Sequence, residues 1–142
     1  MTLNIQRLHP DAILPTRAHP DDAGLDLYAA EQIGIPVLGR NLVSTGIAVA
    51  IPPGHVGYIT PRSGLAHSNG ITVLNSPGAI DAGYTGEIRV NLINHGQAPY
   101  VITPGQRIAQ LVLHPIITPN VEEVDEIPDT ERGTSGHGST GK

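Results

Sequence analysis

The chain has 142 residues, a net charge of −5 and no cysteine, which excludes a disulfide framework, a thiolate metal site and a cysteine nucleophile. This length suits one domain with its own core rather than two domains. No N-terminal run has the pattern of a signal peptide or a membrane span, so we expect a cytoplasmic protein with no membrane partner. The basic residues are scattered singly, which argues against a nucleic-acid partner.

Glycine and proline are frequent, with 17 and 13 residues, and they predict an all-β chain of short strands joined by turns. The sequence has no Phe or Trp and only four Tyr, so aliphatic side chains must fill the core. A small sheet protein of this kind is stabilised when copies of itself cover its strand faces and sheet edges. We therefore expect an oligomer.

The first half of the chain alternates strand-like runs with turns. Residues 3–8 suit an edge strand, and further strand-like runs lie at 33–38, 42–51 and 55–60. Between them, Asp26 belongs to a group of acids close to a glycine turn, without the spacing of a calcium loop. From spacing alone, these acids are interpreted as solvated turn residues.

Residues 61–71 interrupt the strand pattern with one or two predicted helical turns. Ser63 is the expected N-cap of this helix and Gly70 its left-handed C′ residue. Arg62 precedes the helix, and a guanidinium beside free backbone N–H groups favours phosphate binding. An ordinary capped connector has the same sequence pattern, so this segment alone does not decide between the two.

Residues 75–94 predict a tight hairpin followed by a strand. Ser76, Pro77 and Gly78 form the turn signal, and from Glu87 onward apolar and polar residues alternate with a period of two. Asp81 and Tyr84 bracket two small residues that permit close approach to the backbone. An acid and an aromatic residue in this position predict a functional site.

The last third of the chain is expected to contain strands at 99–103, 107–113 and 117–124. An acidic stretch then leads into the tail at 132–142, whose glycine-rich composition predicts a flexible end. Arg132, His137, Ser139 and Thr140 nevertheless place hydrogen-bond donors and a flat ring on this pliable backbone. Such a segment is also suited to wrap a phosphorylated, ring-bearing ligand.

Five motifs occur in order along almost the whole chain: AGLDLYA at 23–29, PRSGLA at 61–66, GAIDAGYTGEIRV at 78–90, GQRIAQL at 105–111 and RGTSGHGSTG at 132–141. In this order they resemble the trimeric dUTPases. The resemblance implies an all-β jelly-roll barrel with one short helix, assembled as a homotrimer. It also implies that residues 1–126 form the domain and that residues 127–142 form a swapped arm, which closes over a neighbouring active site.

The reaction that the resemblance implies is hydrolysis of dUTP to dUMP and pyrophosphate, which limits uracil incorporation into DNA and supplies dUMP for thymidylate synthesis. Asp81 corresponds to the residue that orients the attacking water. Tyr84 resembles the tyrosine that packs under the sugar and excludes a ribose 2′-hydroxyl. Asn75 and the backbone around Ile80 resemble the segment that reads uracil.

The remaining motif positions are implied to hold the triphosphate and its Mg²⁺. The implied phosphate ligands of the body are Arg62, Ser63, Gly64 and Gln110. The implied ligands of the arm are Arg132, His137, Gly138, Ser139 and Thr140. Asp26 resembles the carboxylate that meets the metal through water, with Mg²⁺ held mainly by the triphosphate.

His137 departs from the commonest family pattern, which has phenylalanine at that place. An imidazole can still stack on uracil, but it buries less apolar area and adds a titratable group. We therefore expect arm closure to weaken as the pH falls through the pKa of this histidine.

Two alternatives to dUTP hydrolysis remain at this point. The first is dCTP deamination, alone or combined with dUTP hydrolysis, on the same fold; those enzymes need a glutamate at the base-reading site and usually lack the Asp-Ala-Gly-Tyr order found at 81–84. The second is a binding or regulatory module that keeps the pocket without turnover. Intact Asp81, Arg62 and Arg132 argue against such a module.

Overall fold

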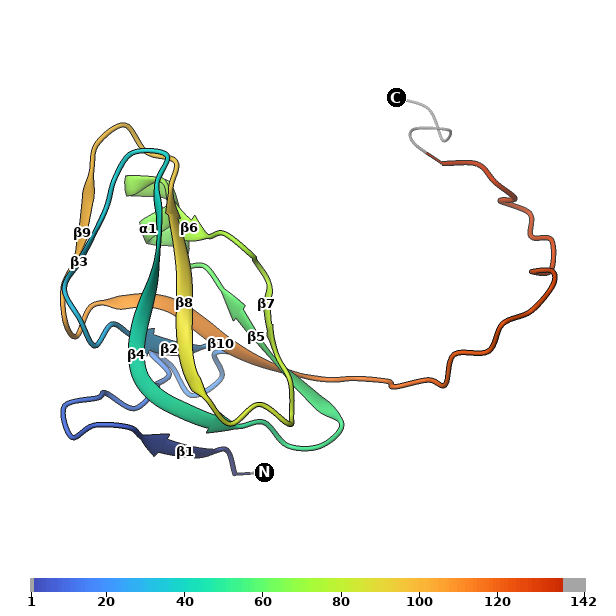
Figure 1. Ribbon diagram of the computed structural model, residues 1–142, viewed down its shortest axis with the longest axis horizontal. Coiled ribbons are helices and arrows are strands. Elements are labelled where there is room, and N and C mark those ends of the chain that lie inside the picture. Colours follow the sequence, from blue (N-terminus) through green and yellow to red (C-terminus); the bar gives the residue numbers. More distant parts are fainter. Residues whose placement is uncertain (1, 137–142) are drawn as a thin grey trace.

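The computed structural model describes residues 2–136, which form two four-stranded sheets and one two-stranded sheet, all antiparallel (Figure 1). The first sheet has the order β1 (Asn4–Arg7), β4 (Arg40–Ala50), β8 (Glu87–Asn94), β6 (Ile71–Val73). The second has the order β2 (Leu25–Tyr28), β10 (Arg107–Pro115), β5 (His55–Thr60), β7 (Gly78–Ile80). The third pairs β3 (Ile33–Ile35) with β9 (Tyr100–Ile102). The expected edge strand at 3–8 is β1, which lies at the edge of its sheet.

One aliphatic core joins the sheets. In β8, the alternation seen in the sequence is realised, because Ile88, Val90 and Leu92 are buried and contact the core cluster. Among the residues that the structure describes, the buried hydrophobic side chains are all Ala, Val, Leu or Ile, and the tyrosines stay partly or fully exposed. The prediction of an aliphatic core is confirmed.

The all-β prediction with one short helix is confirmed for residues 2–136, but the sheets do not close into a barrel there. β1 and β6 end the first sheet, and β2 and β7 end the second. The predicted barrel is therefore replaced by separate sheets packed on a common core, with strand edges left open. No helix in this described range is long and apolar enough to cross a membrane.

The predicted hairpin near residue 76 is wrong. The turn exists, but β6 before it pairs with β8, whereas β7 after it pairs with β5. The loop 81–86 then separates β7 from β8. A turn signal predicts where the chain reverses, but it does not determine which strands pair with the segments before and after the turn.

The helix α1 (Ser63–Asn69) follows β5 directly. Gly70 has φ 67 and ψ 17, so the predicted left-handed C-terminal residue is confirmed. Ser63 was expected as the N-cap, but Arg62 holds that position with extended φ and ψ, and no side chain caps the helix. The Ser63 hydroxyl is thus not committed to a helix cap.

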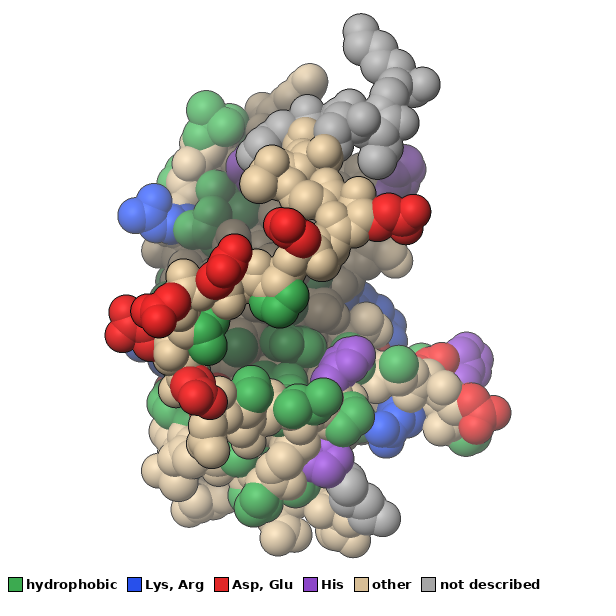
Figure 2. All heavy atoms as spheres, turned by 90° about the vertical axis from the view of Figure 1, so that its right-hand side faces the viewer, with side chains coloured by type: hydrophobic (Ala, Val, Ile, Leu, Met, Phe, Trp, Pro, Cys, Tyr) green, Lys and Arg blue, Asp and Glu red, His purple; other side chains and the backbone are tan. Residues whose placement is uncertain are grey.

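The predicted strand at 117–124 is also wrong, because β10 ends at Pro115 and the following chain has no partner strand up to residue 136. Figure 1 shows this segment leaving the body in a wide arc. It is exposed along its described length, and Ile117 and Val121 are 90% and 99% exposed. The apolar and acidic side chains of this segment are therefore both exposed to solvent. Figure 2 shows them on the face that lies at the right-hand side of Figure 1.

Candidate functional site

The first group of predicted residues lies where three strands of the second sheet run side by side. Asp26 on β2 pairs with Gln110 on β10, and Gln110 pairs in turn with Thr60 on β5. Arg62 follows two residues after Thr60. We call Asp26, Arg62, Arg107 and Gln110 the strand-end cluster.

Asp26 is only 4% exposed and forms two ion pairs. Arg62 Nε donates to its Oδ1 at 3.0 Å, and Arg107 Nη1 donates to its Oδ2 at 3.3 Å. The interpretation of Asp26 as a solvated turn acid is therefore wrong, since a buried carboxylate is retained here by two guanidiniums. Arg107 was not among the predicted site residues, although it stands inside the fourth motif.

The Gln110 side chain lies against Gly24, the residue before β2. A Cβ atom at residue 24 would lie 3.0 Å from Cδ and 3.2 Å from Oε1 of Gln110. The absence of a side chain at Gly24 therefore makes room for the glutamine amide. Ser63 and Gly64 begin α1 next to this cluster, both are exposed, and no atom lies within 4 Å of a Cβ placed on Gly64.

The second group surrounds a pocket of about 310 Å³ that we call the tyrosine pocket. Ile80, Asp81 and Tyr84, all predicted site residues, contribute to its wall. The pocket is also lined by four residues that the sequence did not single out: Leu42, Ala79, Glu87 and Arg89. Leu42 comes from β4, a strand far away in sequence, so only the β4–β8 pairing brings it to this wall.

Tyr84 is held by backbone contacts rather than by burial. Its Oη donates to the Glu87 carbonyl at 2.9 Å, and its N–H donates to the Asp81 carbonyl at 3.0 Å. A Cβ at residue 86 would stand 2.6 Å from the Tyr84 Oη, so Gly86 gives the ring its place. The tyrosine is nevertheless 45% exposed.

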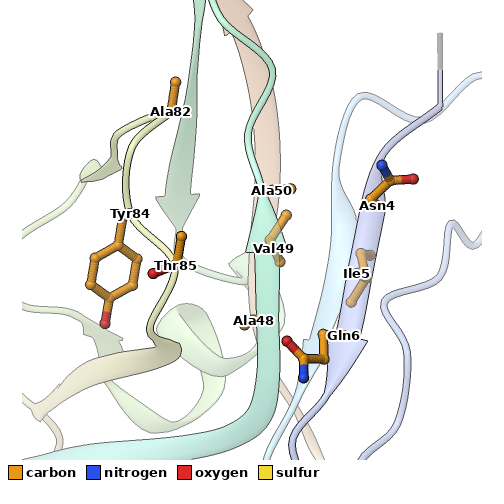
Figure 3. Close-up of a pocket in the computed structure, with 9 residues that line it drawn as sticks. All are labelled: Asn4, Ile5, Gln6, Ala48, Val49, Ala50, Ala82, Tyr84 and Thr85. Atoms are coloured by element: carbon orange, nitrogen blue, oxygen red, sulfur yellow. The ribbon is translucent and has the colours of Figure 1, made fainter.

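A second pocket of about 280 Å³ lies beside the same tyrosine (Figure 3). Figure 3 shows Tyr84 and Thr85 on one wall and residues of β4 and β1 on the other. Tyr84 lines this pocket as well as the tyrosine pocket. Any displacement of the ring would therefore change the walls of two cavities.

Asn75 lies in the exposed turn before β7. Its Nδ2 would be 3.2 Å from a Cβ placed on Gly78, so the amide folds back over this glycine. Gly78 pairs with Ile59 of β5 and Ile80 pairs with Gly57. Asn75 and Ile80 thus lie at opposite ends of the short strand β7.

Within one chain, the two groups are separated along β5. Ile80 pairs with Gly57, whereas Gln110 pairs with Thr60. Three residues of strand correspond to about 10 Å, and Asp81 lies beyond Ile80 in the direction away from Thr60. No residue of the strand-end cluster lines the tyrosine pocket.

The predicted arm residues are only partly described. Arg132 Nε donates to the Ser135 carbonyl at 3.2 Å in a local turn, and the residue is exposed. His137, Gly138, Ser139 and Thr140 lie outside the described residues.

The side chains of residues 2–136 contain no group of three or more His, Cys, Asp or Glu suited to enclose a metal ion. The strand-end cluster offers a single carboxylate, that of Asp26, and both of its oxygens are paired with arginine. This donor set does not form a dedicated metal cage. It fits a divalent ion that brings most of its oxygen ligands with the substrate, as Mg²⁺ does in nucleotide sites.

Comparisons with known proteins agree on one family. The family model described as dUTPase matches residues 10–141. The deoxyuridine 5′-triphosphate nucleotidohydrolase of Clostridium kluyveri is 51% identical over 141 residues and covers 99% of both chains. The enzyme of the same name from Gloeothece citriformis is 52% identical over 141 residues, with 99% of this chain and 97% of the relative covered.

Two solved structures show the same fold. The dUTPase of Staphylococcus bacteriophage 80alpha with dUpNHpp superimposes with a TM-score of 0.91 at 32% identity, covering 99% of each chain. A mutant dUTPase from phage phi11 of S. aureus, which is described with a structural Mg(II) ion, gives a TM-score of 0.83 at 32% identity. That alignment covers 89% of this chain and 98% of the phage chain.

Proposed function

The chain belongs to the dUTPase family, and from this premise we propose that it hydrolyses dUTP to dUMP and pyrophosphate. The observation that carries the proposal is the tyrosine pocket, where Asp81, Ile80 and Tyr84 share one wall. These are the residues that the third motif assigns to water activation, base reading and sugar selection.

In the proposed reaction, the exposed carboxylate of Asp81 accepts a hydrogen bond from a water and aims it at the α-phosphorus, in line with the leaving pyrophosphate. The carboxylate takes up a proton as the P–O bond forms and the α–β anhydride bond breaks. General-base help of this kind contributes about 10²- to 10⁴-fold in rate. Positioning and charge neutralisation supply the larger share of the acceleration.

Tyr84 selects the sugar because its ring occupies the space that a 2′-hydroxyl needs. Forcing additional atoms into a packed site costs about 1 to 3 kcal/mol. The ring is fixed by the Glu87 carbonyl and by the missing side chain at Gly86. Asn75 and the β7 backbone near Ile80 read the uracil edge by hydrogen bonds, which disfavours cytosine because it presents different donors.

The strand-end cluster binds the triphosphate. Arg62, the start of α1 at Ser63 and Gly64, and Gln110 supply donors to phosphate oxygens. When bound with the triphosphate, Mg²⁺ supplies neutralisation of the phosphate charge. Asp26, the single carboxylate of the cluster, would hold the ion through its water shell.

A complete site takes residues from several chains of a homotrimer. Support comes from the separation of about 10 Å between the two groups along β5, because a triphosphate bound beside Arg62 would lie away from Asp81 of the same chain. Residues 127–142 act as an arm over a neighbouring site, where Arg132, His137, Gly138, Ser139 and Thr140 close on the nucleotide. The exposed apolar side chains after Pro115 support such an exchange, since a neighbouring chain would cover them. The cytoplasmic location expected from the sequence stays a prediction.

The test is a turnover panel with dUTP, UTP and dCTP, with and without Mg²⁺, in which pyrophosphate and the nucleotide products are quantified. We expect Mg²⁺-stimulated release of pyrophosphate and dUMP from dUTP, and much slower reaction of UTP and dCTP. A deaminated product from dCTP would favour the deaminase alternative. Tight dUTP binding without pyrophosphate release would favour a binding module.

A further inference from the structure

Glu87 begins β8, and its side chain reaches across to β4. Its Oε1 accepts a hydrogen bond from Ser44 Oγ and a second one from the Gly46 N–H at 2.8 Å. Gly46 has φ 68, and the β4–β8 register is interrupted between Ser44 and Ala48. The β4–β8 ladder leaves the N–H of Gly46 without a strand partner at this irregularity of β4. The Glu87 carboxylate accepts this donor and thereby connects the irregularity to the first residue of β8.

The backbone of the same residue holds Tyr84, because the Glu87 carbonyl accepts the hydrogen bond of the Tyr84 hydroxyl. Burial contributes little to the placement of this ring, which is 45% exposed. The ring position thus depends on where the first residue of β8 stands. That position is set in part by the hydrogen bonds of the Glu87 side chain to Ser44 and Gly46 of β4.

We propose that Glu87 is a positioning residue for Tyr84 and, through Tyr84, for the choice between deoxyribose and ribose. The inference rests on the proposed function, in which Tyr84 excludes the 2′-hydroxyl. Without the Glu87 carboxylate, Ser44 and Gly46 lose their acceptor. The start of β8 then keeps its pairing with Ala48 and the Thr45–Ile88 hydrogen bond, but it loses its two side-chain bonds to β4. The carbonyl that holds the Tyr84 hydroxyl then shifts, and the ring moves with it.

Glu31 provides a matched control. Its Oε1 accepts a hydrogen bond from the backbone N–H of Ser44 at 2.7 Å, so it is a second carboxylate that binds the same residue of β4. Glu31 does not line the tyrosine pocket and has no hydrogen bond to Tyr84 within residues 2–136. Removing it should loosen β4 without displacing the tyrosine.

The experiment compares Glu87→Ala, Glu87→Gln and Glu31→Ala in the full-length protein. The first readout is NMR of the ¹³C-labelled tyrosine rings without nucleotide, where Tyr84→Phe identifies the signal of Tyr84. The second readout is the ratio of kcat/KM for UTP to kcat/KM for dUTP. In Glu87→Ala we expect a shifted or broadened Tyr84 signal and a ratio raised about tenfold, the lower end of what a packed pocket discriminates.

Glu87→Gln should restore both readouts to near the wild type, because an amide oxygen also accepts two hydrogen bonds. Glu31→Ala should leave both unchanged even if its Tm falls. A wild-type Tyr84 signal in Glu87→Ala, or an unaltered substrate ratio, would overturn the proposal. If the wild type released no pyrophosphate from dUTP, the proposed function would fail instead, and the Tyr84 signal alone would still decide whether Glu87 positions the ring.

Discussion

Two carboxylates carry the proposed chemistry, and they lie in opposite surroundings. Asp26 is buried between Arg62 and Arg107, whereas Asp81 is exposed at the wall of the tyrosine pocket. Each oxygen of Asp26 already accepts a hydrogen bond from an arginine, so this carboxylate is committed to holding the two guanidiniums. The exposed Asp81 is free to approach a water, so the two acids have separate duties at the residue scale.

Replacing Asp81 by Asn keeps the size of the side chain and removes the base. We expect Asp81→Asn to bind a non-hydrolysable dUTP analogue with nearly wild-type affinity, while kcat falls about 10²- to 10⁴-fold. Calorimetry gives the affinity, and pyrophosphate release gives kcat. An unchanged kcat would remove Asp81 from the mechanism.

Replacing Tyr84 by Ala opens the space beside the sugar. We expect Tyr84→Ala to raise UTP hydrolysis relative to dUTP by about tenfold or more, since an overpacking cost of about 1 to 3 kcal/mol is relieved. Competition assays with both nucleotides measure the ratio. Tyr84→Phe keeps the ring but loses its hydrogen bond to the Glu87 carbonyl, so its ratio should lie between those of the wild type and Tyr84→Ala. An unchanged ratio in Tyr84→Ala would place sugar selection elsewhere.

At the scale of elements, the segment after Pro115 differs from the rest of the chain because it belongs to no sheet and every residue from 117 to 136 is exposed. Removing the chain from Arg132 onward should therefore leave the body folded. We expect the truncated protein to keep its Tm within a few degrees and to lose most dUTP turnover, because the proposed phosphate ligands of the arm are gone. Thermal unfolding and pyrophosphate release measure the two quantities, and full activity would show that the tail has no catalytic role.

Some elements were predictable from the sequence because local chemistry determines them. The alternation in β8 and the left-handed Gly70 belong to this class, as periodicity and a missing Cβ act within a few residues. The strand expected at 117–124 failed for a non-local reason. Its apolar residues have the right composition, but a strand also needs a partner, and within residues 2–136 this segment pairs with none of the open sheet edges.

In the site, too, the residues that lie close together in sequence were predictable, and those that act through distant partners were not. Asp81, Ile80 and Tyr84 lie close together in sequence, and the structure brings them to one pocket. Arg107 and Glu87 act through partners that are 81 and 43 residues away. Spacing along one chain carries no information on such pairings, which only the strand register reveals.

At the scale of the whole molecule, the proposed trimer predicts that defective chains can rescue one another. Arg62→Ala and Asp81→Asn should each be nearly inactive alone. Refolded together, they should regain about a quarter of wild-type activity, because each mixed closed trimer contains one site with both residues intact. A double variant refolded with Asp81→Asn provides the control and should regain nothing. Failure of the single variants to rescue each other would place both residues in a site built by one chain.

The separation of the tyrosine pocket and the strand-end cluster along β5 also affects trimers that mix normal and defective chains. On the proposed trimer, a chain with a damaged tyrosine pocket inactivates one site and leaves the other two intact, so an equal mixture of normal and damaged chains keeps about half of its active sites. A change that damages both the pocket and the strand-end cluster spoils two sites in every trimer that takes up such a chain. The separation of about 10 Å between these groups would therefore determine how strongly one defective chain lowers the activity of a mixed population of chains.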